Sequence, residues 1–275
     1  MKPLPILVAL CLLGGCAMAF EGGGLLPARF APPPSVAEDR LDAPYVPTPE
    51  PVVEAMLDLA GVGPDDYLID LGSGDGRIPI AAGRRGARAL GVDIDPERIA
   101  QANLAAQLAG VEGRVSFRRQ DLFETPIADS SVVAMYLLPD INLRLRPRLL
   151  TELRPGTRVV THAFTMGDWA PDQRRVIGER NIYLWIVPAV VEGRWELTEG
   201  NGPPATLVLE QHFQAVVGTL AGPGGVAAIR EARLHGTDFS FTVDTASGPR
   251  TYRGIVSDDS IVPESGQAWR ARRVG

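Results

Sequence analysis

The sequence predicts an α/β fold with a doubly wound, mostly parallel sheet, followed by a small antiparallel β-rich domain. Between residues 50 and 163, short apolar runs typical of strands alternate with stretches that have the apolar spacing of helices. Beyond about residue 190, short alternating runs follow one another, separated by glycine and proline, with no long helical pattern between them. Strands that alternate with helices form parallel sheets, whereas strands joined by short turns pair antiparallel.

The first part is expected to contain five strands and four helices. The strands are the apolar runs at 67–71, 89–93, 115–119, 131–137 and 158–163, and the helices cover 51–60, 77–85, 96–108 and 140–153. The helix at 96–108 is the clearest, because Pro96 suits a first turn and Gly110 follows the end. In the β-rich part, strands are expected at 206–213, 238–243, 251–256 and 269–272.

The start of the chain is typical of a secretory signal. Lys2 precedes an apolar run over residues 4–13, which is too short to span a membrane. Two interpretations of its end remain open: cleavage after Ala19, or a lipoprotein signal in which Cys16 carries a lipid anchor. A signal predicts an exported chain, either periplasmic or membrane-anchored; a fortuitous apolar start would leave the chain in the cytoplasm.

These patterns divide the chain into four segments. They are the signal at 1–19, a Pro/Gly-rich linker at 20–41, the α/β domain at 42–189 and the β-rich domain at 190–275.

The composition excludes several classes of function. A net charge of −6 argues against a nucleic-acid partner, because such proteins usually carry a basic patch or stripe. The two cysteines, Cys11 and Cys16, both lie in or beside the predicted signal, so no internal disulfide is expected in the mature chain. With three scattered histidines and no cysteine pair in the body, the sequence predicts no metal site.

The loop after the first predicted strand points to a cofactor. It reads DLGSGDGR from Asp70 to Arg77, and its glycines allow a sharp turn and a close approach of backbone to ligand. Asp93 ends the second strand, where an acid can accept hydrogen bonds from ribose hydroxyls. Asp121 follows the third strand and is suited to accept one from an adenine amino group. All three acids are expected at the carboxyl ends of neighbouring strands, where open α/β sheets bind ligands.

The acids also distinguish between two cofactors. A dinucleotide places its pyrophosphate over the helix that follows such a loop, and the carboxylates of Asp70 and Asp75 would repel it. The same carboxylates suit the sulfonium and α-amino group of S-adenosylmethionine (SAM). The sequence therefore predicts a Rossmann-like domain that binds SAM.

Four motifs carry a resemblance to a known family. They are YVPTP at 45–49, the loop motif DLGSGDGRI at 70–78, GVDIDP at 91–96 and YLLP at 136–139. On these motifs, residues 42 to about 172 resemble class I SAM-dependent methyltransferases. More narrowly, they are similar to the mitochondrial and prokaryotic protein-lysine N-methyltransferases that modify the ATP-synthase c-subunit and the adenine nucleotide carrier.

The resemblance implies a set of site residues and a protein substrate, with membrane-associated proteins among the candidates. The expected cofactor-binding residues are Tyr45, Thr48, Asp70, Gly72, Ser73, Gly74, Gly76, Asp93, Ile94, Asp121 and Leu122. Tyr136 and Pro139 are the expected catalytic residues, with the Tyr136 ring and nearby carbonyls orienting an amine. His162 is either a base or an ordinary core residue. Two alternatives stay open: methylation of a small molecule or lipid, and an exported domain that binds SAM without catalysis.

Overall fold

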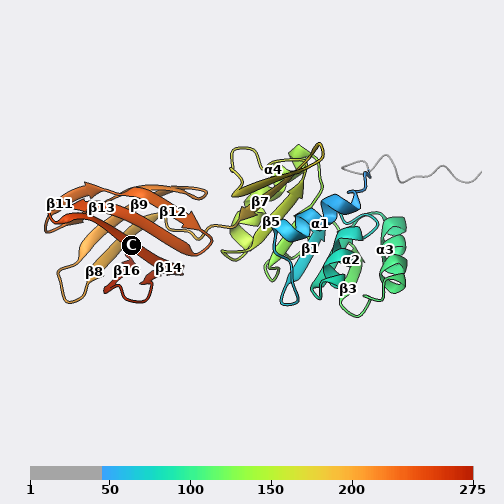
Figure 1. The fold of residues 1–275 in the computed structure, drawn as a ribbon, viewed down its shortest axis with the longest axis horizontal. Coiled ribbons are helices and arrows are strands. Elements are labelled where there is room, and N and C mark those ends of the chain that lie inside the picture. Colours follow the sequence, from blue (N-terminus) through green and yellow to red (C-terminus); the bar gives the residue numbers. More distant parts are fainter. Residues whose placement is uncertain (1–44, 275) are drawn as a thin grey trace, which may run out of the picture. The chain divides into compact units, whose positions relative to one another are not determined.

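The computed structural model describes residues 45–274 (Figure 1). The predicted signal and linker lie outside these residues. The described part contains two β-sheets and four helices, and the helices all precede the second sheet in sequence. They are α1 (Glu50–Leu59), α2 (Arg77–Arg84), α3 (Pro96–Leu108) and α4 (Pro139–Glu152).

The first sheet has seven strands in the order β3-β2-β1-β4-β5-β7-β6. The strands are β1 (Tyr67–Leu71), β2 (Arg88–Asp93), β3 (Val115–Arg119), β4 (Val132–Met135), β5 (Arg158–His162), β6 (Gln173–Ile177) and β7 (Arg180–Ile186). Strands β1 to β5 are parallel, and β6 and β7 add an antiparallel hairpin at one edge. The predicted doubly wound, mostly parallel sheet is confirmed, and the hairpin is an addition that the sequence did not predict.

The two faces of this sheet pack against different helices (Figure 1). In β4, Val132 and Ala134 belong to the core with α1, α2 and α3, whereas Val133 and Met135 belong to the core with α4. Successive side chains of a strand point to opposite faces, and this explains why β4 is apolar throughout. The expected strand at 131–137 is too long: β4 ends at Met135, because Pro139 already begins α4 and residues 136–138 connect the two.

The strand register brings four chain segments to one edge. Leu71 of β1 pairs with Val92 of β2 and with Met135 of β4, and Met135 pairs with Thr161 of β5. The residues that follow these positions therefore lie side by side at the carboxyl ends of the strands. They include the glycine loop, Asp93, Tyr136 and His162.

The second sheet is antiparallel, as predicted, with nine strands in the order β11-β10-β9-β8-β16-β15-β14-β13-β12. The strands are β8 (Gly193–Glu199), β9 (Ala205–His212), β10 (Ala215–Gly222), β11 (Gly225–Ala228), β12 (Arg230–His235), β13 (Asp238–Thr245), β14 (Gly248–Ser257), β15 (Ser260–Pro263) and β16 (Trp269–Arg273). Contacts between β10 and β12 and between β11 and β13 bring the sheet close to a barrel. Large side chains, among them Trp195, Phe239 and Phe241, fill its core.

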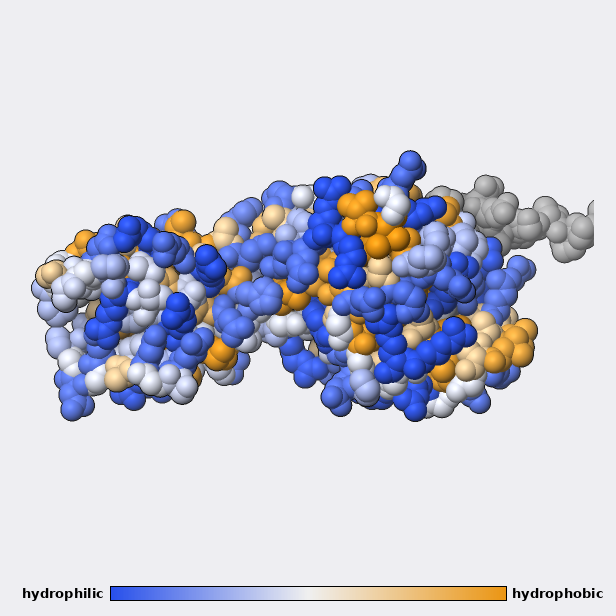
Figure 2. Space-filling model, in the orientation of Figure 1, coloured by the Kyte–Doolittle hydropathy of each residue, from blue (hydrophilic) through white to orange (hydrophobic). Residues whose placement is uncertain are grey.

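Most of the molecular face seen in Figure 2 is hydrophilic, and hydrophobic residues gather there in small patches. Among residues 45–274, no helix is long and apolar enough to cross a membrane.

Candidate functional site

The glycine loop folds tightly against the end of β2. The N–H groups of Gly72 and Ser73 both donate to the carbonyl of Val92, at 2.9 Å each. Gly76 caps α2 in the left-handed region (φ +81°), and a Cβ atom there would lie 2.4 Å from Cζ of Phe117. The loop therefore requires glycine at this position both for its dihedral angle and for space.

Asp93 holds the glycine loop and the start of α3 together. Its Oδ2 accepts a 2.9 Å hydrogen bond from the N–H of Gly74, and its Oδ1 accepts one of 2.9 Å from the N–H of Asp95. Each carboxylate oxygen has a second lone pair free to accept another donor. Asp93 is thus fixed in orientation and retains acceptor capacity for a ligand's hydroxyl groups.

Asp70 places another carboxyl group in this region. It is buried at the end of β1, and burial raises its pKa well above the ordinary value, with the charges of Asp93 and Asp75 adding to the effect. Several acids brought together in this way favour a positively charged ligand, because a cation relieves their mutual repulsion.

Asp75 serves the protein rather than a ligand. The Arg77 guanidinium forms an ion pair with the Asp75 carboxylate, and its Nε lies 2.9 Å from Oδ1 and 3.2 Å from Oδ2. Burial alone would raise the pKa of Asp75, but its bonds to Arg77 outweigh burial and hold the pKa below the ordinary value. Nη1 of Arg77 also donates to the carbonyl of Thr48 at 2.7 Å. Arg77 thereby ties the segment before α1 to the loop.

The Tyr45 ring lies over the glycine loop at Gly74. It lies against Gly74, and the guanidinium carbon of Arg98 is 3.7 Å from the ring centroid. Burial, followed by the neighbouring charge of Asp75, raises the pKa of the Tyr45 hydroxyl. Tyr45 and Thr48, two of the expected cofactor-binding residues, therefore both lie at this loop.

A hollow of ≈ 350 Å³ opens where β2 and β3 end. It is lined by Ile94, Arg119, Gln120 and Asp121. Oδ1 of Asp121 accepts a 2.7 Å hydrogen bond from the N–H of Phe123, and this bond fixes the loop after β3. The hollow, the acids and the close-packed glycine loop fit the adenine, ribose and cationic methionine portions of SAM. The Ser73 hydroxyl has no hydrogen-bond partner within the described chain, and it points towards Gly91.

Beside the glycine loop, three aromatic side chains form a second cluster. Leu137 lies against Gly72, where an added Cβ would be 2.8 Å from Cδ2 of the leucine. The preceding Tyr136 ring lies 3.9 Å from the His162 ring and 6.4 Å from the Phe164 ring, measured between centroids. This aromatic cluster of Tyr136, His162 and Phe164 borders the loop that would hold a methyl donor.

A strained turn at the end of β5 presents two members of this cluster. Ala163 has a φ of +69°, and the N–H of Phe164 donates to the carbonyl of His162 at 2.9 Å, so the three residues form a γ-turn. The Thr161 hydroxyl donates to the carbonyl of Phe164 at 2.6 Å and stabilises the turn. Backbone strain of this kind is characteristic of functional sites.

His162 joins the aromatic cluster to the segment before α1. Its Nδ1 and the Thr48 hydroxyl are 3.2 Å apart in a buried hydrogen bond. Burial, followed by the charge of Arg180, lowers the pKa of His162 to about 4. A neutral imidazole with one nitrogen engaged and such a low pKa is a weak base at neutral pH, so a base role for His162 is disfavoured.

The structure brings most of the predicted residues together. The residues after β1 and β2 meet at the glycine loop, Ile94 and Asp121 share the hollow with Leu122 adjoining it in sequence, and Tyr136 adjoins the loop through Leu137. Pro139, one of the two expected catalytic residues, is the first residue of α4. Neither Phe164 nor Arg77 was predicted from the sequence as a site residue, although Arg77 lies within the loop motif at 70–78. Among residues 45–274, no cluster of three or more His, Cys, Asp or Glu side chains could hold a metal ion.

The matching family model and the similar proteins indicate the same family of methyltransferases. Residues 70–173 match the model of the ANTKMT methyltransferase domain. The chain is 43% identical to a protein-lysine N-methyltransferase of Saccharolobus islandicus over 150 residues, which are 52% of this chain and 93% of that protein. It is 37% identical to the adenine nucleotide translocase lysine N-methyltransferase of Mus musculus, over 62% of this chain and 73% of the mouse protein.

A solved structure gives the same fold with a ligand bound. It is an RNA methyltransferase from Salinibacter ruber in complex with S-adenosyl-L-homocysteine, 50% identical, with a TM-score of 0.52. The match covers 53% of this chain and 96% of the other.

Proposed function

Because this chain belongs to the family of SAM-dependent methyltransferases that includes the protein-lysine N-methyltransferase of Saccharolobus islandicus, we propose that it methylates the ε-amino group of a lysine in a protein. The observation that carries the proposal is the aromatic cluster of Tyr136, His162 and Phe164 beside the glycine loop. SAM, when bound, supplies a methyl group on a positively charged sulfur.

We assign the donor site to the residues around the glycine loop. Gly72 to Gly76 and Asp70 receive the methionine portion, and Asp93 receives the ribose hydroxyls. Ile94, Asp121 and Leu122 receive the adenine, with Asp121 accepting from its amino group. Tyr45 and Thr48 close the segment before α1 over the donor; the hydrogen bonds of Thr48 to Arg77 and His162 support this role.

The acceptor must arrive as a neutral amine. At neutral pH only about one lysine in 10³ is deprotonated, which costs about 4 kcal/mol. An apolar, aromatic pocket lowers this cost by disfavouring the ammonium ion. His162 supports such a pocket because its low pKa keeps the ring uncharged at neutral pH, so the ring adds no positive charge beside the incoming substrate.

The segment between β4 and α4 then orients the amine. The Tyr136 ring supplies one wall, and the carbonyls of Tyr136 and Leu137 are suited to accept hydrogen bonds from the nitrogen. Pro139 has no N–H and begins α4 directly after them, so it fixes where the helix starts. The proton lost by the lysine would pass to solvent, so that the Tyr136 ring and these carbonyls would hold a neutral amine.

RNA is the second candidate acceptor, because the similar Salinibacter ruber protein is named an RNA methyltransferase. The net charge of −6 favours the protein substrate over RNA. A membrane-associated protein acceptor and a lipid anchor at Cys16 remain predictions. N-terminal analysis of the natural protein, looking for Phe20 or a lipidated Cys16, would test the anchor.

The test combines binding with identification of the product. The chain from residue 20 onward is titrated with SAM in a calorimeter, with S-adenosylhomocysteine as competitor, and is then incubated with methyl-labelled SAM and envelope proteins, RNA or lipid. Lys2 is the only lysine in the sequence, so this chain contains none, and any labelled methyllysine must come from the acceptor. Labelled methyllysine is the expected result. Label in RNA or lipid alone would overturn the lysine proposal, and binding without any transfer would favour a non-catalytic SAM-binding protein.

A further inference from the structure

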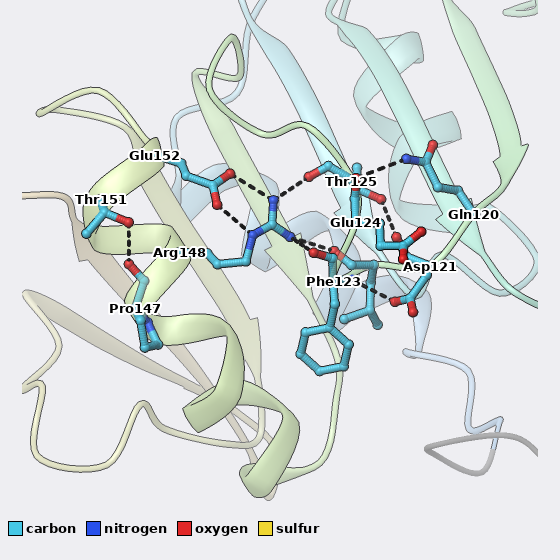
Figure 3. A network of polar contacts seen from close by, with 10 residues as sticks. Gln120, Asp121, Phe123, Glu124, Thr125, Pro147, Arg148, Thr151 and Glu152 are labelled. Carbon is cyan, nitrogen blue, oxygen red and sulfur yellow. Dashed lines mark hydrogen bonds and ion pairs between the residues drawn. The ribbon is translucent and has the colours of Figure 1, made fainter.

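The loop between β3 and β4 carries Asp121, and one arginine of α4 bonds to its backbone at three carbonyls. Arg148 lies on the helix beside this loop, and Figure 3 shows its guanidinium between Glu152 and the loop backbone. Nη1 donates to the carbonyls of Leu122, at 3.2 Å, and Phe123, and Nη2 donates to that of Thr125 at 2.8 Å. Within residues 45–274, none of these three carbonyls accepts a backbone N–H. Arg148 therefore satisfies backbone groups that the loop leaves unpaired.

The remaining donors of Arg148 fix the guanidinium itself. Nε donates to Oε1 of Glu152 at 2.7 Å, and Nη2 donates to Oε2 at 2.8 Å. This two-pronged pairing sets the plane of the guanidinium, as a lysine at the same position cannot. Arg144, one helical turn earlier, lies with its guanidinium carbon 4.0 Å from the centroid of the Phe123 ring. Two arginines on one face of α4 thus hold the same loop residue, one by its ring and one by its carbonyl.

The loop has bonds of its own. The N–H of its first residue, Gln120, donates to the carbonyl of Asp93 at 3.0 Å, whereas the bonds around Asp121 are short-range. Asp121 accepts from the N–H of Phe123, and the Thr125 hydroxyl donates to the carbonyl of Asp121 at 2.8 Å. Such bonds shape the turn without fixing where the turn lies relative to the sheet. Contact with α4 supplies that position, and α4 begins at Pro139, directly after the residues proposed to orient the acceptor.

We propose that Arg148 is a positioning residue for the donor site, which fixes the loop after β3 so that Asp121 can recognise the amino group of the adenine ring. This inference rests on the proposed function, because it concerns the SAM site. Arg148 acts through the backbone of Leu122, Phe123 and Thr125, and it does not itself touch the ligand.

The test compares two ligands that differ at the edge of the base that carries the adenine amino group. S-Adenosylhomocysteine carries the adenine amino group, and S-inosylhomocysteine has a carbonyl in its place. Affinities of both are measured by calorimetry on the chain from residue 20 onward, for wild type, Arg148→Lys and Glu152→Gln. We expect wild type to prefer the adenine ligand at least tenfold, Arg148→Lys to lose most of this preference, and Glu152→Gln to lose a smaller part.

Arg154→Lys is the matched control. Arg154 lies just beyond α4, and its Nη2 donates at 3.1 Å to the carbonyl of Asp129, later in the same connection. A loss of discrimination confined to position 148 and its partner supports the inference, whereas an equal loss in the control would overturn it. Unchanged discrimination in Arg148→Lys and Glu152→Gln, with or without lower thermal stability, would leave Arg148 a purely structural residue. If Arg148→Lys does not fold, Glu152→Gln decides the matter. Failure of wild type to bind either ligand would instead overturn the proposed function and this inference together.

Discussion

The Tyr45 ring occupies the space into which a side chain on Gly74 would project. A Cβ atom at Gly74 would lie 2.6 Å from Cε2 of Tyr45, and the residue has a φ of +52°. Tyr45 can therefore lie over the glycine loop only because residue 74 has no side chain.

Gly74→Ala is therefore expected to displace Tyr45 and to weaken SAM binding at least tenfold, about 1.4 kcal/mol. Calorimetry measures the affinity. Gly113→Ala is the control, because a Cβ there meets nothing within 4 Å. Equal affinities for the two variants would mean that Tyr45 does not pack on the bound donor.

Asp93→Ala should weaken SAM binding by about 1.5–3 kcal/mol, the scale for losing hydrogen bonds to a charged group. The loss has two sources, because Asp93 also holds the N–H of Gly74 at 2.9 Å. Asp93→Asn keeps one acceptor for that N–H and should lose less. Exposed Asp65 provides the control, and its alanine variant should bind as wild type does. Wild-type affinity in Asp93→Ala would remove this residue from the site.

Asp70→Asn should stabilise the ligand-free protein at neutral pH and weaken its binding of SAM. The pKa of Asp70 is raised in the folded protein, so above the ordinary carboxyl range the folded state holds a proton that the unfolded chain has lost. Stability then falls as the pH rises through this window, and the amide variant lacks this dependence. Melting temperatures at pH 5 and pH 8 compare the two proteins. Parallel shifts in both would contradict the assignment to Asp70.

His162 should make the protein less stable in acid. Its pKa is about 4 in the folded protein against an ordinary value of 6.5, so between these values the unfolded chain binds a proton that the folded protein rejects. Stability is therefore fully present above pH 6.5 and is lost as the pH falls towards 4. His162→Asn should flatten this part of the profile, and exposed His212→Asn should not. A wild-type slope in His162→Asn would assign the acid sensitivity to other groups.

The parallel half of the fold could be predicted because β1, β2, β4 and β5 are apolar runs buried on both faces, and because stretches with helical spacing separate the strands. The β6–β7 hairpin could not, because four of the five residues of β6 are exposed and give no apolar alternation. Strands β10, β11 and β12 of the second sheet were missed for the same reason, because each has at most one buried residue.

Asp70, Asp93 and Asp121 could be predicted as site residues because each lies at or just beyond the carboxyl end of a strand, and parallel strands bring these ends together. Arg148 and His162 act through partners that are distant in sequence. The carbonyls bound by Arg148 lie 23 to 26 residues earlier in the chain, and no local pattern in the sequence indicates such a contact. The strained turn at Ala163 could not be predicted either, because an alanine in the sequence does not indicate a positive φ.

The bond between Thr48 and His162 has a consequence for how the enzyme is made. The two residues are 114 positions apart, so a chain that is still being synthesised contains the glycine loop and all three donor acids well before it contains the partner of Thr48. Before β5 pairs with β4, His162 is not in place to bond Thr48. Ordering the segment ahead of α1 then costs conformational entropy that this hydrogen bond does not offset. The closed site is thus completed only when β5 has joined the sheet.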